Sequence, residues 1–307
     1  MSMAILEAAA QEIADATAKP PFLYELGVAG ARQVLDDIQA APIDKLDIVD
    51  KWITVPADVG AVRVRIVKPV LAPAVLPAVV YMHGGGWVLG NAGTHDRLVR
   101  EIAVGVEAAV VFVEYDRSPE ARYPVAIEQG YATAQWVTEN GASEGLDVSR
   151  LAIAGDSVGG NMTAALAIMA KQRGDVRFVH QSMYYPVTDA AQDTASYREF
   201  ADGPFLRAKS MAWFWDAYAP DPTQRAEITA SPLRASLDEL AGLPTAFLLV
   251  DENDVLRDEG EAYANALPHA TLRRVEGTVH GFWRWQTTQI ARDTVREAAQ
   301  AVRQALG

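Results

Sequence analysis

Short apolar runs alternate with amphipathic stretches along most of the 307-residue chain. Six of these runs are mainly apolar and often β-branched: residues 78–82, 109–113, 150–154, 178–184, 245–250 and 271–275. Between most of them lie stretches with apolar positions three or four apart, as in amphipathic helices: residues 97–106, 125–138 and 162–173. Strands that lack polar positions are buried on both faces. Their alternation with helices predicts an α/β fold whose mostly parallel sheet is covered on both sides.

A different pattern precedes the first of these runs. Residues 4–40 have the apolar spacing of helices, with a break at Pro20-Pro21. Residues 48–55 and 62–67 are expected to be strands, and in the second of them apolar positions alternate with arginines. We expect these two strands to form a hairpin at the edge of the sheet, with the helical segment added before it.

The strand expected at 150–154 ends in a tight, glycine-flanked turn. Ser157 lies between Gly155 and Gly159, and a helical run follows at residues 161–171. A turn that projects a hydroxyl from the top of a sheet brings backbone against backbone, which excludes a Cβ at the flanking positions. We interpret this turn as a nucleophile elbow, with Ser157 as the nucleophile. An ordinary strand-to-helix connection with Ser157 as N-cap is the alternative.

A second motif, His83-Gly84-Gly85-Gly86-Trp87, closes the strand expected at 78–82. Consecutive glycines after a buried strand can present backbone N–H groups to the oxyanion of an acyl-transfer intermediate. A flexible loop and a phosphate cradle are the alternatives, although the Lys-Ser/Thr ending of a phosphate loop is absent. We expect His83 to hold the loop rather than to take part in catalysis.

A general base and its acidic partner should follow the nucleophile at the same edge of the sheet. Of the five histidines, His280 lies in a loop just beyond the last expected strand, which suits a base. The others fit structural positions, at a helix start or in and beside strands: His83, His95, His180 and His269. Between Ser157 and His280, residues 251–259 contain several carboxylates, among which Asp254 in the loop is the preferred acid.

The composition excludes several classes of protein. A formal net charge of −13 argues against binding to nucleic acid or to an anionic membrane. The absence of cysteine excludes disulfides, thiolate metal sites and a Cys nucleophile. Residues 1–18 lack the basic start of a signal peptide, and no apolar run is long enough to span a bilayer. We expect a single domain, residues 1–307, in the cytoplasm.

These motifs resemble those of the α/β-hydrolase superfamily, and within it the hormone-sensitive lipase-like bacterial esterases. The loop 83–87 corresponds to the HGGG motif, and residues 155–160 to the GDSAGG elbow. Residues 254–260 look like the DPLRDEG motif, which selects Asp254 as the acid, and residues 280–282 match HGF. Val158 replaces the usual Ala after the nucleophile. The resemblance implies an eight-stranded α/β-hydrolase sheet and a Ser157–Asp254–His280 catalytic triad.

The resemblance also implies a helical cap, built from about residues 1–41 and 188–231. The second of these segments is rich in aromatic residues, some of which should line the substrate pocket. Backbone N–H groups of Gly85, Gly86 and Val158 would form the oxyanion hole. The residues that we expect to contact the substrate are Trp87, Tyr184, Phe205 and Phe214.

We therefore expect a serine esterase that hydrolyses short- to medium-chain carboxylic esters without a metal or cofactor. The alternatives are an amide hydrolase of the arylformamidase type, which shares the HGGGW sequence, and a non-catalytic small-molecule-binding protein on the same fold. Relatives often form homodimers, although nothing in the chain identifies an interface. The physiological ester and the stereoselectivity are not predicted by the sequence.

Overall fold

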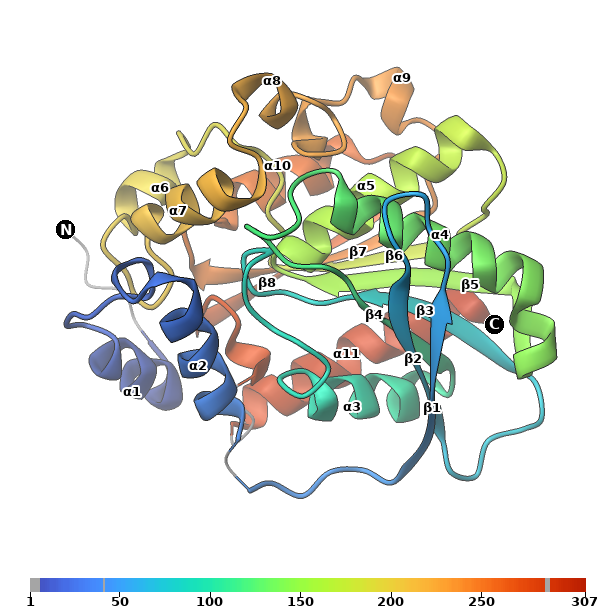
Figure 1. The fold of residues 1–307 in the computed structure, drawn as a ribbon. Coiled ribbons are helices and arrows are strands. Elements are labelled where there is room, and N and C mark those ends of the chain that lie inside the picture. The colour runs from blue at the N-terminus through green and yellow to red at the C-terminus, as the bar shows by residue number, and fades with distance from the viewer. Residues whose placement is uncertain (1–5, 41, 285–287) are drawn as a thin grey trace.

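An eight-stranded, mostly parallel sheet runs through the middle of the protein (Figure 1). The computed structural model describes residues 6–40, 42–284 and 288–307. The strand order is β1-β2-β4-β3-β5-β6-β7-β8, with β2 antiparallel to both neighbours and the other pairs parallel. The strands are β1 Ile48–Val55, β2 Val62–Pro69, β3 Leu76–Met82, β4 Ala109–Glu114, β5 Leu146–Asp156, β6 His180–Tyr184, β7 Thr245–Asn253 and β8 Ala270–Val279. The α/β fold and the edge hairpin predicted from the sequence are confirmed.

Helices cover both faces of this sheet. In Figure 1, α3 and α11 lie on one face, and α4, α5 and α10 lie on the other. Their bounds are α3 Asp96–Val106, α4 Val125–Asn140, α5 Val158–Arg173, α10 Arg257–Ala266 and α11 Gln289–Leu306. Helix α5 is buried continuously from Val158 to Ala170. A helix that is buried all round packs on several sides, and α5 contacts β5, β6 and α4.

The remaining helices lie mainly outside these layers. They are α1 Ala8–Ala16, η1 Leu23–Glu25, α2 Gly27–Gln39, η2 Gly141–Glu144, α6 Ala195–Glu199, α7 Ala208–Tyr218, α8 Pro222–Arg225, η3 Pro232–Arg234, α9 Leu237–Leu240 and η4 Phe282–Arg284. The helical pattern expected over 4–40 is therefore divided at Pro20-Pro21, and residues 4 and 5 lie outside the described residues. In Figure 1, α1 and α2 lie on the same side of the molecule as α6 and α7. No helix of the described part of the chain has the length and apolar character needed to cross a membrane.

The functional motifs follow the carboxyl ends of four strands. Strand β3 ends at Met82, β5 at Asp156, β7 at Asn253 and β8 at Val279. Because these strands are parallel, their carboxyl ends lie at one edge of the sheet, where α/β proteins bind ligands. Strand β5 is longer than residues 150–154 because its first residues pair with the start of β3, with Leu146 opposite Leu76. The topology thus places the elbow, the glycine-rich loop, the acid loop and the histidine loop together.

Candidate active site

Ser157 lies in a strained turn between β5 and α5. Its backbone angles are φ 57° and ψ −120°, a region that L-residues rarely occupy. A Cβ on Gly159 would lie 2.0 Å from the backbone oxygen of Met82, and one on Gly155 would lie 2.4 Å from the backbone of Gly159. The two glycines therefore allow β3, β5 and α5 to approach closely, as an elbow requires. The Ser157 N–H donates to the Tyr184 carbonyl at 2.8 Å, which fastens the turn to β6.

A continuous hydrogen-bonded chain joins Ser157, His280 and Asp254. The Ser157 hydroxyl lies 3.0 Å from His280 Nε2, and His280 Nδ1 lies 2.7 Å from Asp254 Oδ2. With the proton on Nδ1, Nε2 is free to accept from the serine hydroxyl, which is the tautomer that activates a nucleophile. All three residues are at most 5% exposed, so this hydrogen-bonded chain is largely shielded from water. The structure thus brings together the three residues that the sequence motifs selected.

A second buried carboxyl, Asp251, lies beside this chain. It accepts a hydrogen bond from the Thr278 hydroxyl at 2.9 Å. Burial, together with the nearby charge of Asp254, raises the pKa of Asp251 well above its usual range. The neutral form of Asp251 is therefore favoured, and the carboxyl that contacts His280 is that of Asp254. Asp251, Asp254 and His280 are close enough to hold a metal ion, but both ring nitrogens of His280 already take part in the chain to Ser157.

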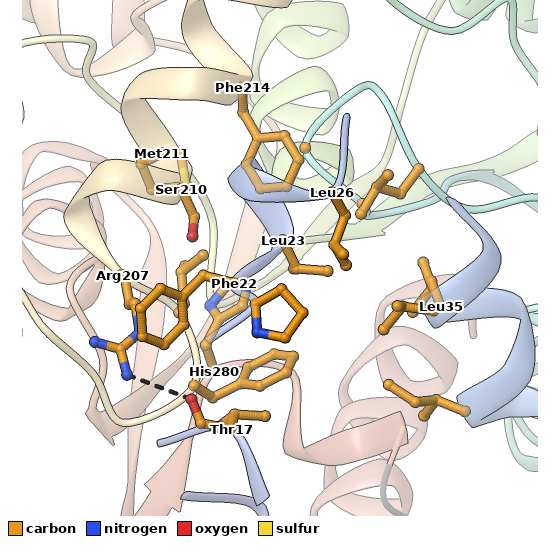
Figure 2. Close-up of a pocket in the computed structure, with 18 of the residues that line it drawn as sticks. Thr17, Phe22, Leu23, Leu26, Leu35, Arg207, Ser210, Met211, Phe214 and His280 are labelled. Atoms are coloured by element: carbon orange, nitrogen blue, oxygen red, sulfur yellow. Dashed lines mark hydrogen bonds between the residues drawn. The ribbon is translucent and has the colours of Figure 1, made fainter. Parts of the chain in front are cut away.

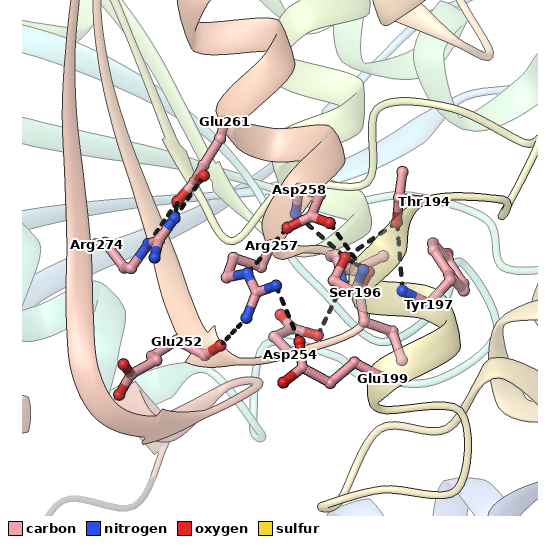
Figure 3. Close-up of polar contacts among 12 residues, drawn as sticks. Thr194, Ser196, Tyr197, Glu199, Glu252, Asp254, Arg257, Asp258, Glu261 and Arg274 are labelled. Carbon is pink, nitrogen blue, oxygen red and sulfur yellow. Dashed lines mark hydrogen bonds and ion pairs between the residues drawn. The ribbon is translucent and has the colours of Figure 1, made fainter. Parts of the chain in front are cut away.

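The acid loop is fixed by contacts to β7 and to the segment that contains α6 (Figure 3). Asp254 Oδ1 accepts from the backbone N–H of Leu256 at 3.1 Å. Arg257 donates to the Glu252 carbonyl at 3.0 Å and to the Asp258 carboxylate at 2.9 Å. Ser196 in α6 donates its hydroxyl to the Val255 carbonyl and its N–H to Asp258, both at 2.7 Å. A shift of α6 would therefore displace the loop that carries Asp254, which contacts His280.

The glycine-rich loop after β3 turns through left-handed conformations, with φ values of 119° at Gly85 and 63° at Gly86. Within the described residues, neither of their N–H groups donates to a backbone carbonyl, and both glycines line a cavity with Ser157. The N–H of Val158 belongs to the first turn of α5, where no carbonyl of the helix can accept it. Three N–H groups are thus available near the nucleophile, as the oxyanion-hole prediction requires.

Buried polar side chains hold this loop from behind. Asp156 Oδ1 accepts from the Gly84 N–H at 2.9 Å and from the Tyr81 hydroxyl at 3.0 Å. His83 Nδ1 lies 2.8 Å from the Gly84 oxygen, and its ring stacks on Tyr115 with centroids 4.1 Å apart. Burial lowers the pKa of His83 well below its usual range, which keeps the ring neutral. The sequence analysis did not assign a role to Asp156. Its place at the end of an apolar strand was nevertheless a signal that this carboxylate has a specific hydrogen-bonding role.

Ser157 and His280 line a cavity of about 330 Å³. Figure 2 shows most of the residues that surround it, with His280 among them. Apolar side chains from two separate segments form most of its wall. Residues 16–38 contribute Phe22, Leu23, Leu26, Val34, Leu35 and Ile38, and the segment before and within α7 contributes Phe205, Leu206, Met211 and Phe214. Phe205 and Phe214 therefore lie where the sequence analysis expected substrate contacts. Polar groups enter the wall at few places, among them Arg207 and Lys19, neither of which was predicted.

Two of the expected pocket residues lie elsewhere, and that prediction is wrong for both. Trp87 is fully buried, and its ring stacks on Tyr218 at a centroid distance of 4.1 Å, so it supports α7 from below. Tyr184 projects from β6 toward the face covered by α3 and α11, where it packs on Trp283 with centroids 4.1 Å apart. Its backbone carbonyl, rather than its ring, contacts the elbow. The side chain of Val158, which replaces the usual Ala after the nucleophile, is buried in the core and does not line the cavity.

Comparison with known proteins agrees with this geometry. The profile of a family described as "alpha/beta hydrolase fold" matches residues 79–284. The chain is 39% identical to Esterase LipI of Mycobacterium tuberculosis over 272 residues, which are 85% of this chain and 84% of that protein. It is 33% identical to an ethyl acetate hydrolase of Pseudomonas putida over 252 residues, 80% of this chain and 79% of that one. The crystal structure of a thermostable esterase from Pseudomonas putida ECU1011 has a TM-score of 0.96 and 41% identity, covering 98% of both chains. The chain therefore belongs to the α/β-hydrolase family, in its hormone-sensitive lipase-like branch, and it is a carboxylic-ester hydrolase.

Proposed function

We propose that this enzyme hydrolyses short- to medium-chain carboxylic esters through an acyl-enzyme intermediate on Ser157. The observation that carries the proposal is the buried hydrogen-bonded chain from Ser157 through His280 to Asp254 at the floor of an apolar cavity. In this proposal Ser157 is the nucleophile, His280 the general base and Asp254 the group that holds the imidazole tautomer.

The reaction proceeds in two halves. Ser157 Oγ attacks the ester carbonyl while His280 Nε2 takes the hydroxyl proton, and the resulting imidazolium is stabilised by Asp254. The backbone N–H groups of Gly85, Gly86 and Val158 donate to the oxyanion of the tetrahedral intermediate. His280 then gives the proton to the departing alkoxide oxygen, which releases the alcohol. A water molecule, deprotonated by His280, then attacks the acyl-enzyme. The bond between the acyl carbon and Ser157 Oγ breaks, His280 returns the proton to Oγ, and the carboxylic acid is released.

The cavity supports a preference for small to medium acyl groups. Its wall is mostly apolar, so it can hold an alkyl chain, and its volume of about 330 Å³ is at the small end of ligand pockets. A relative that is 33% identical is named an ethyl acetate hydrolase, which fits short esters. Trp87 lies outside the pocket wall, so the Trp of the HGGGW sequence supplies no pocket contact that would favour an aryl-formamide.

We also propose that the chain is one catalytic domain whose cap consists of about residues 1–41 and 188–231. Residues 1–5 and 41 lie outside the described part of the chain. Within the described part, both segments line the cavity that contains Ser157, which is the position of a cap. Cytoplasmic location and a homodimer stay predictions.

The test is hydrolysis of a p-nitrophenyl ester series from acetate to palmitate, with an aryl-formamide added, by the parent enzyme and Ser157→Ala. Ser143→Ala, at an exposed position in η2, is the matched control. We expect turnover of short esters by the parent and the control, and loss of turnover in Ser157→Ala. Ser157→Ala activity equal to the parent would contradict the mechanism, and faster turnover of the formamide than of every ester would replace the esterase with the amidase.

A further inference from the structure

The charges around the catalytic cavity differ in sign from the protein as a whole. The chain carries 40 acidic and 27 basic residues. Yet among the described residues, those that line the cavity include two basic side chains, Lys19 and Arg207, and none that is acidic. A positive site in an acidic protein raises the local concentration of anions relative to the rest of the surface. The cavity is therefore suited to a substrate with negative charge.

Arg207 has unused hydrogen-bonding capacity at the wall of this cavity. Its Nη2 donates to the Thr17 carbonyl at 3.3 Å, the contact drawn in Figure 2. Its Nε is buried and has no partner among the described residues, and no carboxylate of those residues forms an ion pair with it. The guanidinium lies over the Phe22 ring, with 4.0 Å from its carbon to the ring centroid. Buried N–H groups of a charged side chain normally donate a hydrogen bond. The Nε–H of Arg207 is therefore a donor that a ligand could satisfy.

The position of Arg207 at the start of α7 does not stabilise that helix. It is the N-cap residue of α7, and its side chain makes no capping hydrogen bond. A helix N-terminus carries partial positive charge, so a cation there is unfavourable, and Ser, Thr, Asp or Asn would cap better. A ligand anion at this place would interact favourably with both the guanidinium and the first turn of α7.

We infer that Arg207 binds a carboxylate carried by the substrate, so that this enzyme prefers esters that also contain a free carboxylate group. The inference rests on the proposed ester hydrolysis at Ser157. A guanidinium offers two parallel N–H donors that match the two oxygens of a carboxylate. Phe22 and its apolar neighbours would shield this ion pair from water and so strengthen it.

The test compares matched esters that differ in one carboxylate. 4-Acetoxybenzoate and methyl 4-acetoxybenzoate place the difference on the leaving alcohol, whereas monoethyl adipate and ethyl heptanoate place it on the acyl group. The measured quantity is the ratio of kcat/KM for the anionic ester to that for the neutral ester. It is determined for the parent, Arg207→Met, Arg207→Lys and the control Lys209→Met. Lys209 is an exposed cation of the same helix that does not line the cavity.

We expect Arg207→Met to lower this ratio by about tenfold to a hundredfold for at least one of the two pairs, which is the range for a hydrogen bond to a charged group. Arg207→Lys should retain part of the ratio because it keeps the positive charge, and Lys209→Met should retain all of it. The pair that responds shows whether the carboxylate belongs to the acyl or the alcohol part. An unchanged ratio in Arg207→Met for both pairs would overturn the inference while leaving ester hydrolysis intact.

Binding to the inactive Ser157→Ala variant separates this inference from the proposed mechanism. By titration calorimetry we expect the anionic ester of at least one of the two pairs to bind Ser157→Ala at least tenfold more tightly than its neutral counterpart does, and Ser157→Ala/Arg207→Met to lose that difference. This result does not depend on turnover, so it can support carboxylate binding even if Ser157 proves not to be the nucleophile. Equal affinities of Ser157→Ala for the anionic and neutral ester within both pairs would contradict carboxylate binding at Arg207.

Discussion

The close packing of Gly86 against Phe214 of α7 makes a direct test of the oxyanion hole possible. A Cβ at residue 86 would lie 2.1–2.3 Å from three ring atoms of Phe214. Carbon atoms in contact are normally about 3.5–4.0 Å apart, so Gly86→Ala requires a displacement of roughly 1.3 Å. Phe214 is only 4% exposed and has little room to move. We expect the loop to carry much of the displacement, which moves the Gly86 N–H beyond hydrogen-bond distance of the oxyanion.

The loss of one oxyanion-hole donor typically costs about 3–4 kcal/mol, or roughly 10²–10³-fold in kcat. A left-handed conformation at residue 86, where φ is 63°, adds about 1–2 kcal/mol of backbone strain in an alanine variant. Phe214→Ala removes the ring that the new Cβ would meet. The double variant Gly86→Ala/Phe214→Ala should therefore regain at least about tenfold in kcat over Gly86→Ala, a coupling of about 1.4 kcal/mol.

The assay is kcat for p-nitrophenyl acetate, whose small acyl group depends least on the cavity wall that Phe214→Ala changes. Circular dichroism and the melting temperature check that each variant is folded. Gly242→Ala is the matched control, because its φ is 75° and no atom lies within 4 Å of the added Cβ. It measures backbone strain without a clash and should leave kcat unchanged. The reasoning is refuted if Gly86→Ala keeps kcat within threefold of the parent, or if the double variant is no faster than Gly86→Ala.

Two further predictions concern buried titratable groups. Asp254→Asn should lower kcat by roughly 10³–10⁴-fold because it favours the wrong tautomer of the histidine. Asp251→Asn should stay within threefold of the parent, because burial favours the neutral carboxyl, which asparagine resembles in shape and charge. Similar losses in both variants would contradict the assigned roles. Burial lowers the pKa of His180 from 6.5 to about 4. As the pH falls, the histidine of the unfolded state is therefore protonated before that of the folded state. The free energy of unfolding should decrease between about pH 6.5 and pH 4, by up to about 3 kcal/mol. Urea unfolding at pH 4.5 and 7.5 should show a smaller loss in His180→Gln, and an equal loss would show that His180 contributes nothing to the slope.

Most of the fold and the elements of the triad could be predicted because their signals are local in sequence. The glycines at 155 and 159 were predicted for a steric reason, and the close approach of Met82 to Gly159 supplies it. His280 followed from its place after the last strand, since parallel strands end at one edge. The choice of Asp254 over Asp251 needed the family resemblance, because spacing does not show which carboxyl faces the imidazole.

The pocket was less predictable because its wall depends on how distant segments pack. Trp87 and Tyr184 were expected there because they are aromatic and close in sequence to the motifs. Sequence proximity places only a backbone, however, and in both residues the side chain turns into the core. In β6, successive side chains point to opposite faces of the sheet, and this alternation directs the Tyr184 ring away from the cavity. Because every residue of β6 is buried, no polar–apolar pattern in the sequence shows which side chains point toward the cavity.

Arg207 shows why a substrate preference is harder to derive from sequence than a mechanism. Its hydrogen bond to Thr17 joins residues 190 positions apart, so the two cap segments must be assembled before the guanidinium acquires its surroundings. In the sequence alone, Arg207 is one of 27 basic residues and has the ordinary interpretation of a solvated charge. The buried, unpaired Nε contradicts that interpretation, because solvent would satisfy it at an exposed site. Arg207, the proposed carboxylate-binding residue, lies on a segment separate from those that bear Ser157, Asp254 and His280. A substitution at residue 207 can therefore change which esters are accepted without changing the chemistry of the triad.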